Sequence, residues 1–193
     1  YLYVLCRLMR QIELIRALDQ LEKMQRHVIA SKRFAKLFPS DSKQSYEMGI
    51  TRAVRNGLLV RGAYGVLVNP RSRYFGQYTL EWIARSMRPA DISYVSLETV
   101  LSQHGVISQI MIDRITIMTT GRSGEIKTQY GVIEFTHTKR SFLDIVASTY
   151  EIDGQPLKIA TVKTALRDLR RVGRNMHLVD LSVFDEIMDY QKS

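Results

Sequence analysis

An acidic pattern in the second half of the chain has the clearest catalytic precedent. Asp113 is followed by Glu125-Ile126-Lys127, which has the Asp…Glu-x-Lys form of metal-dependent nucleases. In such sites two carboxylates hold a divalent ion and the lysine assists the attacking water. The chemistry indicated is hydrolysis of a phosphodiester.

The expected geometry disfavours that site. Residues 121–124 read as a tight turn between two strands, which would place Glu125 opposite Thr120. Asp113 would then lie seven residues along the strand, on the order of 23 Å away. Two carboxylates so far apart cannot share one ion, so a nuclease is the least favoured of the functions considered.

Histidine and cysteine offer no alternative metal site. The histidines are far apart in sequence and lack metal-ligand spacing, so we expect structural or solvated side chains at His27, His104, His137 and His177. The single cysteine, Cys6, excludes an intramolecular disulfide, and we expect it to be a small core residue. We therefore predict no metal and no cofactor.

Two basic features of this half remain ambiguous. Arg122 and Ser123 lie in the Gly-rich stretch 121–124, where N–H groups and an arginine suit a phosphate, although a plain β-turn explains the same residues. A later run reads either as a solvated helix face or as a second DNA contact surface: Arg167, Arg170, Arg171 and Arg174.

Charge is the most informative property of the first half. Residues 1–78 hold 14 Lys and Arg against 5 Asp and Glu, a net +9, whereas residues 79–193 hold 14 of each, a net of zero. A basic excess confined to one segment indicates a module that binds a polyanion, joined to a neutral partner domain. We place the two domains at 1–76 and 77–193.

Membrane and secreted classes are disfavoured. No apolar run approaches the roughly 20 residues that a membrane helix needs, and Arg7 and Arg10 interrupt the apolar start, so we predict no signal peptide and no membrane partner. The lone cysteine suits a reducing cytoplasm. Because the chain opens on Tyr1, we expect its natural start to lie upstream.

The elements of the basic segment follow from periodicity and capping. A long helix is expected over 2–24, with Ile12, Ile15, Leu18 and Leu21 on its apolar face. After a break at 27–29, Ser31 caps a short helix whose inward residues are Phe34, Leu37 and Phe38. Asp41 or Ser42 caps a third helix to Asn56, and a β-hairpin over 58–68 follows.

This order of elements predicts a winged helix-turn-helix. Its second motif helix enters the major groove of DNA, and flanking basic residues hold phosphates. We assign Lys43, Gln44, Ser45 and Arg52 to the groove, and Arg55 to a base or a phosphate. Tyr64 at the hairpin tip is expected against the backbone or minor groove, and the phosphate candidates are Arg33, Lys36, Arg61, Arg71 and Arg73. The alternative is a solvated, helical protein-interaction domain.

The neutral segment is predicted to be an α+β domain on a small antiparallel sheet. Strands are expected over 94–95, 114–120, 125–129 and 132–138. Helices are expected over 79–87, 97–103, 161–171 and 181–190, with Ser96 capping the second.

Several strings resemble one family. The stretch Tyr94–Ile107 (YVSLETVLSQHGVI) is similar to the signature of the AbiEi antitoxins of type IV bacterial toxin-antitoxin systems, which act in phage defence. The next block is matched by Thr119–Ser123 (TTGRS) and Tyr130–Phe135 (YGVIEF), and a third by Leu157–Ala160 (LKIA) and Ala165–Leu169 (ALRDL).

The resemblance implies a cytoplasmic, non-enzymatic DNA-binding antitoxin. Such a protein represses its own operon at inverted repeats and antagonises a nucleotidyltransferase-like toxin without a stable direct complex. It is expected as a monomer or weak dimer, with two copies on DNA and with Arg122 and Ser123 as candidate antitoxin contacts. The alternative is a winged-helix regulator whose second domain senses a ligand or dimerises.

Overall fold

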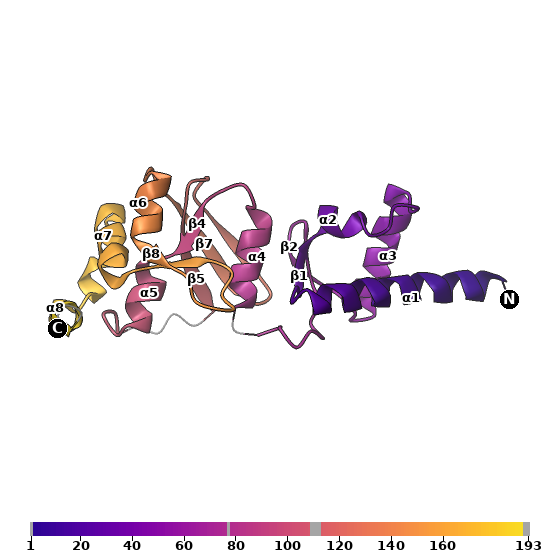
Figure 1. Ribbon diagram of the computed structural model, residues 1–193, viewed down its shortest axis with the longest axis horizontal. Coiled ribbons are helices and arrows are strands. Elements are labelled where there is room, and N and C mark those ends of the chain that lie inside the picture. The colour runs from indigo at the N-terminus through magenta and orange to yellow at the C-terminus, as the bar shows by residue number, and fades with distance from the viewer. Residues whose placement is uncertain (1, 77, 109–112, 191–193) are drawn as a thin grey trace. The chain divides into compact units, whose positions relative to one another are not determined.

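The chain forms two compact units. The structure is a computed structural model that describes residues 2–76, 78–108 and 113–190, with side chains from residue 11 onward. Unit 1 is Tyr1–Thr79 and unit 2 is Leu80–Ser193 (Figure 1). The expectation for Cys6 falls outside the described side chains. In the described part of the chain, no helix is long and apolar enough to cross a membrane.

Unit 1 combines three helices with a three-stranded antiparallel sheet. The strands lie in the order β1-β3-β2. The elements in chain order are α1 (Leu2–Lys23), β1 (Val28–Ala30), α2 (Ser31–Ala35), α3 (Lys43–Arg55), β2 (Val60–Ala63) and β3 (Val66–Val68).

One apolar core joins these elements. Leu18 and Leu21 of α1, Phe34 of α2 and Ile50 of α3 are buried together with Leu67 of β3. Removing such side chains from water contributes about 1.5–3 kcal/mol each. The core therefore fixes α3 against both the long helix and the sheet.

Three sequence expectations for unit 1 were wrong. Ile12 and Ile15 are exposed, because α1 buries the neighbouring stripe of Ala17, Leu18 and Leu21. Leu37 is also exposed, since α2 ends at Ala35 and its periodicity does not reach that far.

The expected cap of α2 and the expected break at residues 27–29 also differ from the structure. The N-cap position of α2 is Ala30, and Ser31 is the first helical residue. The break at 27–29 contains the start of β1, which pairs with β3. A three-residue strand is too short to show an alternation in sequence.

Unit 2 is a layered α+β structure. Its helices are α4 (Thr79–Met87), α5 (Leu97–Gln103), α6 (Phe142–Ala147), α7 (Val162–Val172), the 3₁₀ turn η1 (Met176–Leu178) and α8 (Leu181–Tyr190). Its strands are β4 (Ser93–Val95), β5 (Arg114–Thr119), β6 (Gly124–Thr128), β7 (Gly131–His137), β8 (Thr149–Tyr150) and β9 (Lys158–Ala160). In Figure 1, α4 covers one face of the sheet and α5 and α7 cover the other.

The sheet of unit 2 is larger than expected, and it is mixed. Six strands lie in the order β6-β7-β5-β4-β9-β8. The pairs β5–β7 and β4–β9 are parallel, and the others are antiparallel. The predicted small antiparallel sheet was therefore wrong in size and pairing, because β8 and β9 were missed and β7 inserts between β5 and β6.

Candidate nucleic-acid interface

Helix α3 begins and ends at clear sequence signals. The side chain of Ser42 caps it by accepting a hydrogen bond from the Ser45 amide at 3.2 Å. Gly57, with φ of +68°, follows the C-cap residue Asn56 in the left-handed region that glycine adopts without strain. These signals confirm the expected bounds of the helix.

The inner side of α3 is fixed by packing and by one tyrosine. Ile50 and Ala53 are buried in the core. The Tyr46 hydroxyl donates to the Ser31 carbonyl oxygen at 2.9 Å, which joins α3 to the start of α2. Burial raises the pKa of Tyr46, while the hydrogen bond with Ser31 and the charge of Arg61 act in the opposite direction.

The outer side of α3 carries the residues predicted to read DNA. Lys43, Gln44 and Arg55 are exposed, whereas Ser45 and Arg52 are half-buried. Ser45, Arg52 and Arg55 all line the space beside α1. The Arg52 guanidinium donates from Nε to the Met48 carbonyl oxygen at 3.4 Å. Among the described residues, Arg52 and Arg55 form no ion pair within 4 Å. Their charges are therefore available to an anion.

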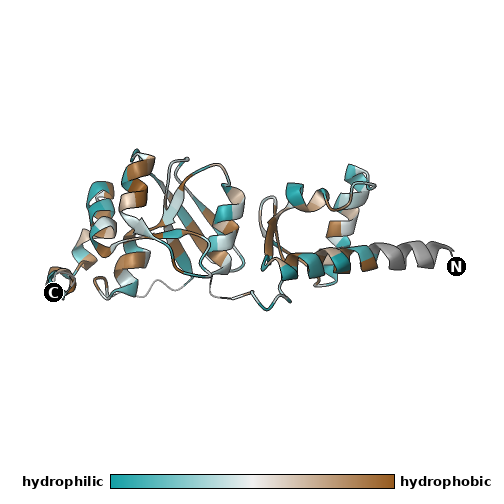
Figure 2. Ribbon diagram, in the orientation of Figure 1, coloured by the Kyte–Doolittle hydropathy of each residue, from teal (hydrophilic) through white to brown (hydrophobic). Residues whose placement is uncertain are grey.

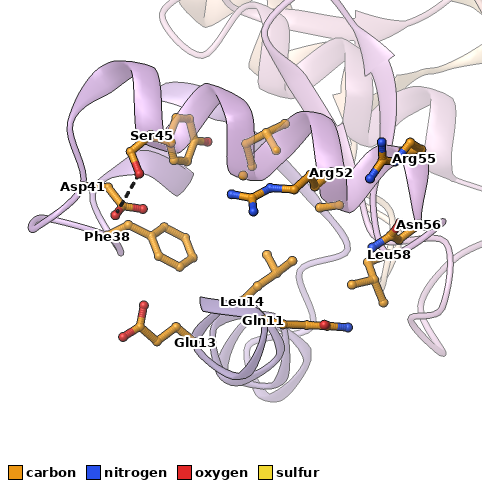
Figure 3. Close-up of a pocket in the computed structure, with 14 residues that line it drawn as sticks. Gln11, Glu13, Leu14, Phe38, Asp41, Ser45, Arg52, Arg55, Asn56 and Leu58 are labelled. Atoms are coloured by element: carbon orange, nitrogen blue, oxygen red, sulfur yellow. Dashed lines mark hydrogen bonds between the residues drawn. The ribbon is translucent and has the colours of Figure 1, made fainter. Parts of the chain in front are cut away.

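A cavity of about 290 Å³ lies between α1 and α3. Figure 3 shows Arg52 projecting from α3 over this space, with Leu14 of α1 below it. Ser45 lies at one end of the cavity, where its hydroxyl donates to Asp41 at 3.5 Å. Ser45 and Arg52 thus stand at the edge of the outer face that is nearest α1.

The β2–β3 hairpin projects an aromatic tip. Tyr64 is 99% exposed at the turn, next to Gly65 with φ of +72°. Arg61 is exposed on β2 and pairs with Leu67 of β3, and the register shifts between Arg61 and Ala63. An exposed tyrosine on a short hairpin can lie against a nucleic-acid backbone without disturbing the core.

Of the remaining phosphate candidates, Arg73 forms an ion pair among the described residues, and the other three do not. Arg33 and Arg71 are exposed, as is Lys36, and the described residues give them no ion pair. Arg73 differs, since its guanidinium lies 3.3 Å from Glu22 and stacks near Tyr74. A partner that binds Arg73 must compete with Glu22.

The segment after the hairpin is fastened to the rest of unit 1 by hydrogen bonds. The Ser72 hydroxyl and the Arg73 amide both donate to Glu22 of α1. His27 is buried and lies 3.1 Å from the Thr79 hydroxyl, and burial lowers its pKa while the charge of Glu22 opposes the shift. These contacts fasten Ser72 and Arg73 to α1, and Thr79 to the segment that follows α1.

In unit 2, the Ser123 side chain is hydrogen-bonded within the fold, whereas the Arg122 side chain is exposed. The Ser123 hydroxyl accepts from the His137 amide at 2.9 Å, and His137 Nδ1 lies 2.8 Å from the Gly121 carbonyl oxygen. The Arg122 side chain is exposed, and its carbonyl oxygen accepts from Arg88. Residues 120–123 cross the end of β7, so the expected tight turn at 121–124 was wrong.

The same topology corrects the distance argument against the nuclease pattern. Glu125 is not opposite Thr120, because β6 pairs with β7 and not with β5. Instead Glu125 forms a 2.8 Å ion pair with Arg114, the residue after Asp113. Within the described ranges, no group of three or more His, Cys, Asp or Glu residues could hold a metal ion.

Arg174 is not on a solvated helix face, which corrects one reading of the basic run. It lies beyond the end of α7 and contacts Glu98 through two nitrogens, at 2.9 and 3.1 Å, as well as Glu134. Arg114 contacts Glu134 in turn at 2.8 Å. The result is an alternating chain from Glu98 to Glu125 that links α5, β7, β5 and β6.

Sequence reasoning missed a buried polar cluster beneath α7. Asp168 is fully buried and accepts hydrogen bonds from Tyr94 at 3.1 Å, Ser96 at 2.9 Å and Arg140 at 2.6 Å. Ser96 occupies the N-cap position of α5, as expected, but its side chain makes no cap hydrogen bond. Leu97 beside it has φ of +59°, a costly value for a branched side chain. The only sequence signal was the resemblance, whose strings contain Tyr94, Ser96 and Asp168.

Comparisons with known proteins add no family assignment. The chain matches no protein-family model, and it has no significant match among curated proteins.

Proposed function

We propose that the protein is a DNA-binding transcriptional repressor whose unit 1 is a winged helix-turn-helix. The observation that carries the proposal is the exposed outer side of α3, which presents Lys43, Gln44 and Arg55, within a unit of net charge +9. In this assignment α3 is the recognition helix and the β2–β3 hairpin with Tyr64 is the wing. Helix α3 is capped, packed on its inner side and free on its outer side, which suits insertion into a major groove.

We further propose that it acts as an antitoxin of the type IV class. This part rests on the AbiEi-like strings alone, three of whose residues form the buried cluster of unit 2. The expected activity is autorepression at inverted repeats and antagonism of a nucleotidyltransferase-like toxin without a stable complex. Two copies would bind one operator, and unit 2, with no catalytic role, would supply the antitoxicity.

The test separates base contacts from phosphate contacts. Alanine at Lys43, Gln44 or Arg52 should weaken binding to a selected operator by about 1–3 kcal/mol and relax its specificity. Arg71→Ala should weaken binding to operator and random DNA alike. Affinities are measured by fluorescence anisotropy on both duplexes at one salt concentration. Equal losses on both duplexes for all four variants would refute the assignment of α3.

A dimerising regulator is the second candidate, and α6 favours it. Figure 2 shows α6 as predominantly apolar, yet Phe142, Leu143 and Val146 are exposed and only Ile145 is buried. A patch of this kind suits a protein contact. A toxin gene immediately downstream of the gene for this protein would favour the antitoxin, and its absence would favour the regulator.

A further inference from the structure

The exposed face of α3 has an apolar centre. At 100° per residue, its middle row consists of Gln44, Met48, Thr51 and Arg55, all of which are exposed. Met48 is 53% exposed at the centre of this row. A single exposed methionine is ordinary on a protein surface, so its neighbours decide what it means.

Thr51 adds a second apolar group at the same place. Its hydroxyl donates to the Glu47 carbonyl oxygen at 2.9 Å, so this polar group is already engaged with the helix backbone. The methyl group of Thr51 is therefore the branch that remains available for a contact with DNA. Residues three apart on a helix are neighbours, and the Met48 side chain therefore lies beside the Thr51 methyl.

Two of the polar residues first expected to read bases, Ser45 and Arg52, lie to one side of this centre. Both line the cavity between α1 and α3, as does Arg55 from the middle row (Figure 3). Gln44 and Arg55 lie along the middle row on either side of Met48. A duplex that meets this face squarely therefore meets Met48 at its centre, with polar side chains around it.

The major groove offers one apolar group for such a centre to contact. Every base edge there presents hydrogen-bond donors or acceptors, and thymine alone adds a 5-methyl group. A thioether in contact with a polar base edge displaces water and does not replace the hydrogen bonds that the water made with the base, which is unfavourable. Against a thymine methyl, the same contact buries apolar surface on both sides.

We propose that Met48, supported by the methyl group of Thr51, recognises the 5-methyl group of a thymine near the centre of each operator half-site. The inference rests on the proposed function and specifies which DNA that function selects. It also makes Met48 a specificity-determining residue that carries neither charge nor a strong hydrogen-bonding group.

The test removes only the methyl group from the DNA. Operator duplexes selected from a random pool by the full chain are remade with deoxyuridine in place of each thymine in turn. Binding of the wild-type protein should fall about three- to tenfold at one position in each half-site. Met48→Ala should bind the unmodified operator about as weakly and should show no further loss with deoxyuridine. Met48→Leu should keep the discrimination.

Met24 supplies the matched control, because it is a 58% exposed methionine of the same unit outside α3. Met24→Ala should behave as wild type on every duplex. The inference is overturned if wild type binds all deoxyuridine duplexes equally well, or if Met48→Ala keeps the full methyl dependence. A wild-type protein that selects no sequence at all would instead contradict the proposed function.

Discussion

Glu81 is a carboxylic acid that the fold of unit 2 keeps from water. Burial raises its pKa from 4.5 to about 7, and hydrogen bonds from Gln155 and the Leu157 backbone oppose the shift only in part. The folded protein therefore holds this proton more tightly than the unfolded chain does. Its contribution to stability is complete below pH 4.5 and is lost as the pH rises towards 7, a change of about 3 kcal/mol.

Glu81→Gln should remove this pH dependence. The variant should be more stable than wild type at about pH 8 and close to it at about pH 4.5, as measured by urea unfolding at both values. Asp153→Asn, at an exposed carboxylate, serves as the control and should keep the wild-type profile. A variant whose stability is below that of wild type at the higher pH would contradict the assignment.

Arg140 balances the charge of the fully buried Asp168. Arg140→Ala would leave that carboxylate without its cation, which typically costs about 3–5 kcal/mol. Arg167→Ala, one residue before Asp168 but exposed, should change stability by no more than about 0.5 kcal/mol. Adding Asp168→Asn to Arg140→Ala should recover part of the loss. Equal effects of the two arginine changes in denaturant unfolding would show that the pair does not stabilise the fold.

At the scale of elements, the turn into β7 depends on a glycine. Gly131 has φ of +130°, and a Cβ added there would press on the Asp113 carbonyl group, whose carbon atom would lie only 2.9 Å from it. Gly131→Ala should therefore destabilise unit 2 by about 1–3 kcal/mol. Gly124→Ala at the start of β6, where a Cβ meets nothing within 4 Å, is the matched control for thermal unfolding. Equal melting temperatures for the two variants would contradict this account of the turn.

Elements were predictable where local signals define them. Helix α3 runs from a cap at Ser42 to a C-cap at Asn56, and the sequence predicted a helix to Asn56 with Asp41 or Ser42 as its cap. The existence of β5, β6 and β7 was also predictable, because each is long enough to show a β pattern. Strand neighbours were not, since pairing β5 with β7 across an intervening β6 is a long-range choice that no local pattern specifies.

The candidate site shows the same division. That α3 has a polar outer side follows from its periodicity, so the candidates Gln44 and Arg55 could be placed in advance. The same periodicity places Met48 on that side, but a methionine is not a residue type that signals base contacts, so it was not among the predicted site residues. The packing of α1 could not be predicted from sequence, and with it the cavity that Ser45, Arg52 and Arg55 line.

For the whole molecule, the charge distribution predicts a salt-dependent partner. If about five phosphates are neutralised per copy, the logarithm of the DNA association constant should fall with the logarithm of salt concentration at a slope near −4.5. Arg71→Ala should reduce that slope by about one. Titrations over a range of about 50 to 200 mM salt check both values. Binding that does not change with salt would contradict the electrostatic argument.

The internal ion pairs of unit 2 determine which of its charges are left at the surface. Arg114, Arg140 and Arg174 are neutralised by carboxylates within the fold, so they add little to the surface potential. Outside these ion pairs, α7 keeps several exposed basic residues whereas α8 carries acidic residues and no basic one. Unit 2 is thus neutral in total but presents opposite charges on two of its helices, so a polyelectrolyte would attract one of them and repel the other.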